Sequence, residues 1–171
     1  AGFTPAFDTS WEDTSIASRL PTDTAKASTA MTTVGFVDAA TGNMNVLFRQ
    51  YISLALTAGQ TITGAQALKA QMRVKERDVA NNMFFALGIR IIASDGSTVQ
   101  KTVFELARDD VEADSTALVN RQFTATSAAT NYTTVTGDRI VVEVGTGGDP
   151  GVGSDHDSDI RICDAYAADL P

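Results

Sequence analysis

The sequence predicts an all-β protein, an antiparallel β-sandwich of the jelly-roll type with an extended N-terminal arm. Three observations lead to this prediction. Short apolar runs recur along the chain from Val34 onward, several of them in strict alternation with polar residues. Turn signals separate these runs at intervals of roughly 8–12 residues, which is typical of sandwiches. The connections are long and uneven, which favours Greek-key crossings over a simple up-and-down barrel. The second choice after a jelly roll is an immunoglobulin-like sandwich.

The chain divides into an arm over residues 1–33 and a sandwich domain over residues 34–171. A length of 171 residues corresponds to one domain, and a hydrophobic content of 43% is enough for a core. The first 33 residues are rich in Thr, Ser, Ala and Asp and show weak periodicity. Phe3, Phe7 and Trp11 could anchor this arm, either on its own domain or on a neighbouring subunit.

The clearest strand signal lies over residues 67–79, where Leu68 to Val74 alternate apolar and polar side chains with period two. This pattern predicts a strand with one buried face, and it places the basic residues Lys69, Arg73, Lys75 and Arg77 on the other face. Residues 83–93 form the most apolar run and are predicted to be a central strand. The Asp95-Gly96 pair that follows predicts a tight hairpin to a strand over residues 99–106, with positive φ at both turn residues.

Further strands are predicted over residues 31–37, 46–56, 60–62, 121–127, 132–135, 139–144 and 159–163. The stretch 108–120 contains Asp109, Asp110, Glu112 and Asp114. Its acidity predicts a connection with one short helical turn rather than a strand.

Charge and hydropathy exclude two classes of partner. A net charge of −8 and a pI of about 4.5 disfavour binding to nucleic acid, because an acidic surface repels phosphates. No apolar run approaches the roughly 20 residues that span a bilayer, so no membrane partner is expected. The single cysteine, Cys163, excludes an internal disulfide framework and predicts folding in a reducing cytoplasm.

Catalytic signatures are missing from the sequence, and the chain is predicted to be non-enzymatic. His156 is the one histidine, and no nucleophile motif accompanies it. Asp155, Asp157 and Asp159 are candidate calcium ligands, because closely spaced carboxylates in a glycine-rich loop supply the oxygens that calcium prefers. The alternative is a solvated acidic loop with no cofactor. The strand residues Glu76, Glu105 and Glu143 are not paired by any sequence pattern, which argues against a glycosidase.

Two parts of the chain resemble structural proteins of tailed bacteriophages. The early part is Arg49-Gln-Tyr-Ile-Ser53 with the segment 58–64. The late part is residues 137–145, Asp155-His-Asp-Ser-Asp-Ile-Arg-Ile162 and the closing residues 168–171. The similarity covers most of residues 46–171. The resemblance implies a virion structural protein of β-sandwich type, made in the host cytoplasm, without distinguishing head from tail.

A capsid decoration or cement protein is the leading hypothesis for function. An acidic sandwich with an arm suits an accessory subunit that binds the major capsid protein or other virion subunits, as a homo-oligomer, with avidity from repeated contacts. The first alternative is a tail or baseplate appendage that contacts the host. The second is a carbohydrate-binding β-sandwich module that would use the acidic loop for calcium and aromatic side chains for sugar.

Overall fold

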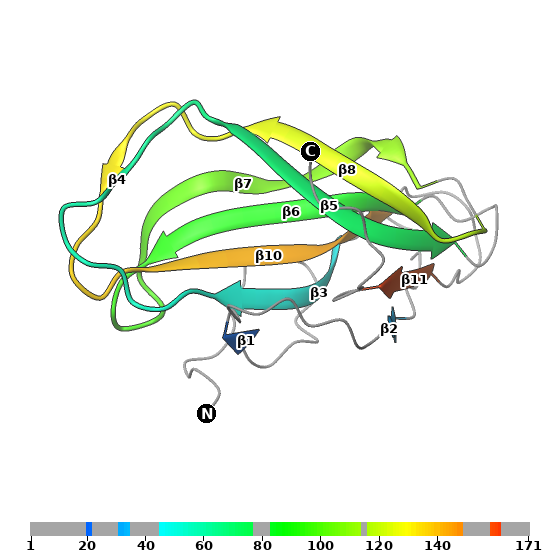
Figure 1. Ribbon diagram of the computed structural model, residues 1–171, viewed down its shortest axis with the longest axis horizontal. Helices are drawn as coiled ribbons and strands as arrows, with labels where there is room; N and C mark the ends of the chain where they lie inside the picture. The colour runs from blue at the N-terminus through cyan, green and yellow to red at the C-terminus, as the bar shows by residue number, and fades with distance from the viewer. Residues whose placement is uncertain are drawn as a thin grey trace.

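The computed structural model describes residues 20–21, 31–34, 45–76, 83–113, 116–148 and 158–161, and these ranges contain strands and no helix. The strands form a five-stranded sheet in the order β1-β3-β10-β6-β7, a four-stranded sheet in the order β2-β11-β5-β8, and the short pair β4-β9 (Figure 1). Every pairing is antiparallel except that of β1 with β3. The prediction of an all-β, antiparallel sandwich is confirmed. The strands are β1 (Leu20–Pro21), β2 (Met31–Val34), β3 (Asn45–Ile52), β4 (Thr61–Ile62), β5 (Ala67–Glu76), β6 (Met83–Ile92), β7 (Val99–Glu112), β8 (Val119–Thr126), β9 (Tyr132–Thr133), β10 (Arg139–Gly148) and β11 (Ser158–Arg161).

The strand order is that of a jelly roll, which is a long antiparallel ribbon rolled into two facing sheets. The ribbon pairs are β2 with β11, β3 with β10, β5 with β8 and β6 with β7. Early strands of the chain thus pair with late strands, and the two strands in the middle pair with each other. Rolling adds the pairs β11 with β5 and β10 with β6. The pair β4-β9 continues the same ribbon where it bends from one sheet to the other. The predicted jelly-roll topology is therefore confirmed.

The core lies between the two sheets and is built around aromatic side chains. Phe123 of β8 packs edge-on against Phe85 of β6 and Phe104 of β7, with ring centroids 5.7 Å and 5.5 Å apart. Such pairs contribute about 0.5–1.5 kcal/mol each beyond area burial. Met72 and Val74 of β5, which lies in the same sheet as Phe123, belong to the same cluster of buried residues. The alternation predicted for β5 is confirmed, because these two side chains are buried while Lys69 is exposed.

The predicted central strand and hairpin are also present, with one correction in the turn. β6 lies between β10 and β7, and all but one of its residues are buried. In the turn, Gly96 has a positive φ of 79°, but Asp95 does not. The Asp95 carboxylate instead accepts hydrogen bonds from the backbone N–H groups of Ser97 and Thr98, at 2.8 and 2.9 Å. One left-handed residue is enough because the side chain closes the other half of the turn.

The predicted connection over residues 108–120 is wrong for its first part. β7 continues to Glu112, which pairs with Phe84 of β6, and no helical turn lies in the described residues of this stretch. β7 is an edge strand and carries several charged side chains. Its sequence pattern therefore resembles that of a solvent-exposed loop. The Arg108 guanidinium lies over the Phe84 ring, 4.4 Å from its centroid, and covers apolar surface there. Charges and register irregularities protect this edge from pairing with other chains.

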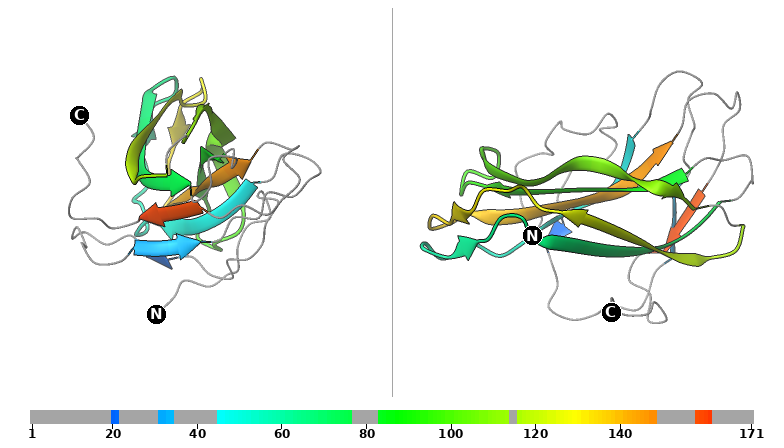
Figure 2. Two further views of the ribbon diagram at one scale, coloured as in Figure 1. Left: turned by 90° about the vertical axis from the view of Figure 1, so that its right-hand side faces the viewer. Right: turned by 90° about the horizontal axis from the view of Figure 1, so that it is seen from above.

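The three connections 53–66, 93–98 and 127–138 gather at one end of the molecule (Figures 1 and 2). We call this the loop end. At the N-terminal side of the chain, β1 adds to the edge of the five-stranded sheet, with Leu20 opposite Tyr51. Residues 31–33 of the predicted arm belong to β2 of the four-stranded sheet, and the arm residues that belong to neither strand lie outside the described residues.

Candidate functional site

Five of the six residues selected from the sequence as site candidates lie outside the described residues. These are Phe3, Phe7, Trp11, Asp155 and Asp157. The sixth, Asp159, lies on β11 and is 4% exposed. One of its carboxylate oxygens lies 2.9 Å from Lys75 Nζ on the neighbouring strand β5.

The ion pair gives Asp159 a structural partner that the sequence did not suggest. Lys75 belongs to the basic stripe of β5, which faces away from the core, and Asp159 meets it across the β11–β5 pairing. The carboxylate therefore compensates a neighbouring ammonium group. Among the described residues, no group of three or more His, Cys, Asp or Glu side chains is arranged to hold a metal ion.

The most unusual polar cluster lies in the middle of the five-stranded sheet. Gln50, Arg90 and Glu143 come from the adjacent strands β3, β6 and β10 and are 0%, 7% and 1% exposed. The Gln50 amide nitrogen Nε2 donates to Glu143 Oε1 at 2.5 Å, and the Arg90 guanidinium forms an ion pair with Glu143 Oε2. We call these three residues the buried polar cluster.

The cluster occupies the face of the sheet that points away from the core. Val142 and Val144 pack on the core, so Glu143 between them points to the opposite side. Its neighbours on that side, including Ile52, Ile92 and Val141, are buried as well and form a small apolar cluster. The sheet is therefore buried on both faces, and the Arg90–Glu143 pair is withdrawn from water.

A cavity of about 70 Å³ adjoins the cluster between β6, β7 and β10. It is large enough for a few water molecules and has both polar and apolar walls. Gly88 opens this space, because a β-carbon there would lie 3.4 Å from Glu143 Oε2. The lining residues are Gly88, Arg90, Thr102, Phe104, Glu105, Leu106 and Glu143.

The chemistry available to the buried polar cluster is structural. Both oxygens of Glu143 are engaged by fixed neighbours, so the carboxylate is not presented as a general base or nucleophile. The pair instead fixes the register of three adjacent strands, because the polar groups match only in one alignment. The sequence contained a signal for this position: Glu143 interrupts an otherwise apolar strand, Ile140-Val-Val-Glu-Val144.

The loop end carries a second polar network, centred on Asp138. This buried carboxylate accepts hydrogen bonds from the Tyr132 hydroxyl and the Val135 backbone N–H, both at 2.7 Å. Burial and the neighbouring carboxylate raise the pKa of Tyr132 to about 12. The Thr134 hydroxyl donates to the Thr57 carbonyl at 2.7 Å and accepts from the Gln60 backbone N–H at 3.0 Å. These contacts tie the two long connections to each other.

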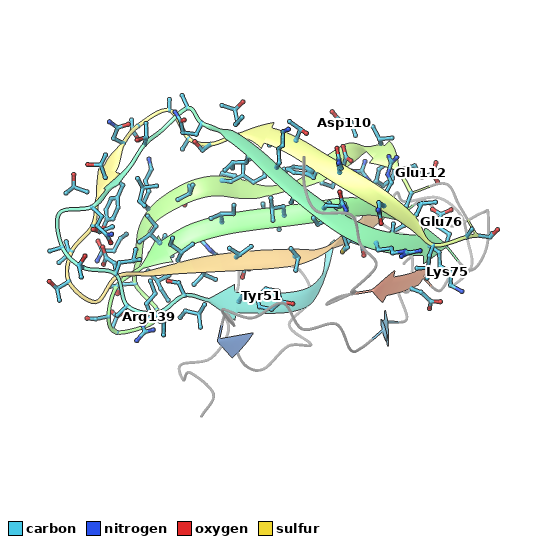
Figure 3. All side chains as sticks on the ribbon, viewed as in Figure 1. Tyr51, Lys75, Glu76, Asp110, Glu112 and Arg139 are labelled. Carbon is cyan, nitrogen blue, oxygen red and sulfur yellow. The ribbon has the colours of Figure 1, made fainter. Side chains whose placement is uncertain are left out.

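The aromatic residues considered for sugar stacking do not form a platform in the described part of the chain. Tyr51 is half-buried on β3, opposite Leu20 of β1 (Figure 3). Tyr132 is half-buried at the loop end with its hydroxyl bound to Asp138. Trp11, Tyr166, His156 and Cys163 lie outside the described residues.

Comparisons with known proteins show no family for this chain. No family model and no curated protein matches it. Among solved structures, it is similar to a chain in a structure of infectious bursal disease virus, Gt strain, with 18% sequence identity and a TM-score of 0.28. The match covers 92% of this chain and 36% of that one, so this chain spans about a third of the neighbour's length. A TM-score this low supports no conclusion about function. The described residues include no helix with the length and hydropathy to cross a membrane.

Proposed function

We propose that this chain is a non-enzymatic virion structural protein, and that it is a decoration or cement protein of a bacteriophage capsid. The observation that carries the proposal is the jelly-roll strand order. This fold recurs in viral capsid domains and in lectins. Fold alone does not establish function, and the contacts between specific side chains provide further support.

The two parts of the sequence that resemble tailed-phage structural proteins meet in the fold. Arg49 and Gln50 on β3 pair with Val144 and Glu143 on β10. The Gln50–Glu143 hydrogen bond joins the early part to the late part directly. Segments about a hundred residues apart thus form one structural unit, as expected if the resemblance describes a shared architecture.

The ionisable groups of the described residues support a non-catalytic role. The buried carboxylates of Glu143 and Asp159 are paired with Arg90 and Lys75. Asp138 accepts two hydrogen bonds within the loop end. Each of these groups has partners that stabilise the fold, and the second carboxylate on the wall of the cavity, Glu105, is exposed.

A decoration protein would stabilise the shell by mass action. Binding to the assembled shell but not to free subunits shifts the assembly equilibrium towards the intact particle. Repetition of a modest contact over a symmetric lattice gives avidity without a single large interface.

The test is the copy number of this chain relative to the major shell protein in purified particles from its source. A ratio of about one, or a fixed simple fraction of it, is expected for a protein bound to the capsid lattice. A few copies per particle would overturn the decoration role and favour a tail or baseplate appendage. Absence from every particle would overturn the virion proposal and leave the carbohydrate-binding module, which a glycan array would then test.

A further inference from the structure

Two of the three segments at the loop end lie in uncharged stretches of a strongly acidic protein. No charged residue lies between Gln50 and Leu68 or between Gln122 and Gly137, although the chain has a net charge of −8. The fold brings these two distant runs together through the β4-β9 pair, at the same end of the molecule (Figures 1 and 2).

Few charges approach this surface from its rim. Asp95 is exposed in the β6–β7 turn, and hydrogen bonds from Thr98 and Ser97 lower its pKa to about 2. Asp138 is buried, and the half-buried Arg139 donates to the Ser53 carbonyl at 2.9 Å. Lys101 is half-buried and donates to the Thr130 hydroxyl.

Two large apolar side chains project from the loop end. Leu54 is 74% exposed and Val135 is 59% exposed, whereas most aliphatic side chains of the described strands are buried or half-buried. Hydrogen bonds hold the backbone beside them. Ser53 and Leu56 N–H, on either side of Leu54, donate to the Ile140 and Asp138 carbonyls at 2.9 and 2.7 Å, and Val135 N–H donates to the Asp138 carboxylate at 2.7 Å. Leu54 and Val135 are thus presented on a rigid support.

Rigid presentation of apolar groups is favourable for association. A surface that is already ordered loses little conformational entropy when it binds. The cores of protein interfaces are depleted of charge, as this surface is. The remaining exposed residues of the loop end are mainly Ala and Thr, which are small and allow close approach of another surface.

The lack of charge at this surface favours a partner with the same net charge as this protein. If the acidic protein docked here on a basic partner, acidic side chains would be expected at the contact, because complementary charge steers and orients association. An uncharged contact instead suits a partner that carries the same net charge, since it places the repelling groups away from the interface. A second copy of this chain is such a partner.

We infer that two copies of this chain associate through their loop ends, with Leu54 and Val135 at the centre of the contact. The contact is isologous, so that the same patch is used by both copies. This inference gives a surface to the homo-oligomer expected from the sequence, and it does not require the proposed function to be correct.

The test is sedimentation equilibrium of the full chain and its variants over a concentration series reaching about 0.1 mM, a range that resolves micromolar affinities. Leu54→Asp and Val135→Asp are each expected to raise the dissociation constant at least about tenfold, because each places like charges across the contact.

Val111→Asp is the matched control, since Val111 is 54% exposed on β7 between Asp110 and Glu112. Figure 3 shows those two neighbours far from Arg139 and the loop end. The control should associate like the wild type.

Salt dependence provides a second readout. Raising the ionic strength should strengthen the association of the wild type, because it screens the repulsion between two copies of net charge −8 while the contact has no ion pairs to lose. A wild type that stays monomeric throughout the series, or variants that associate as tightly as the wild type, would overturn the inference. An association that salt weakens would also overturn it. None of these measurements uses particles, so their failure is distinct from a failure of the copy-number test.

Discussion

The buried polar cluster permits a quantitative test of how the five-stranded sheet is held together. The perturbation is Glu143→Gln, which keeps the shape of the side chain and removes its charge. Arg90, 7% exposed, would then lie beside a neutral amide in a site withdrawn from water. The hydrogen bond from the Gln50 amide would be retained by rotation of the new side chain, so the charge is the main quantity that changes.

The magnitude follows from the burial of both partners. Removing one member of a buried ion pair typically costs about 3–5 kcal/mol, because the other charge stays desolvated. At about 2–4 °C per kcal/mol for a domain of this size, the melting temperature should fall by about 6–20 °C. Removing both charges, as Arg90→Met with Glu143→Gln, should recover most of this loss, because no unpaired charge stays buried and the new amide oxygen still accepts from Gln50.

The assay is urea unfolding followed by circular dichroism, with the free energy of unfolding extrapolated to water. Glu105→Gln is the matched control, since Glu105 lines the same cavity but is exposed, and its cost should stay within about 0.5 kcal/mol. A loss below about 1 kcal/mol for Glu143→Gln, equal to that of the control, would refute a desolvated ion pair at this site.

Three further predictions concern other sites. Gly137→Ala should destabilise the fold by more than Gly59→Ala: both glycines have positive φ, 93° and 82°, but a β-carbon at Gly137 would meet a serine side chain at 2.7 Å and one at Gly59 meets nothing within 4 Å. Unfolding free energies of the two variants test this, and equal losses would contradict it. The raised pKa of Tyr132, about 12 against an ordinary 10.0, contributes stability that is complete below pH 10 and is lost as the pH rises towards 12. Tyr132→Phe should therefore flatten the alkaline unfolding curve, and an unchanged curve would assign the loss to other groups. Because the Asp159 carboxylate is paired with Lys75, we expect calcium and EDTA to leave the melting temperature unchanged; a rise with calcium would restore the interpretation as a calcium site.

Strands were predicted correctly from the sequence where at least one face of the strand is apolar. The prediction was wrong where a charged strand lies at the edge of a sheet. β5 and β6 were recognised because their apolar side chains report burial on one face or on both. The second half of β7 was not, because Asp109, Asp110 and Glu112 are charged and the strand pairs on one side only. A local pattern does not distinguish a solvated edge strand from a loop.

The sites show the same division. Asp159 was selected from the sequence as an acidic loop residue, and its ion pair with Lys75 depends on the pairing of β11 with β5. Gln50, Arg90 and Glu143 are separated by tens of residues, and only the rolled ribbon brings them together. The sequence predicts that Glu143 lies on a strand, but no local pattern predicts that Gln50 and Arg90 are its partners.

By itself, the sequence determined that the chain is an antiparallel β-sandwich, because strand formation and one-sided burial are encoded in the period-two alternation and in the turn residues. It also determined the acidic net charge and the lack of charged residues over 51–67 and 123–136. The neighbours of each strand, the pairing of the charges and the meeting of the uncharged segments at one end follow from the folded arrangement. These properties depend on contacts between residues far apart in the chain, and no local pattern specifies them.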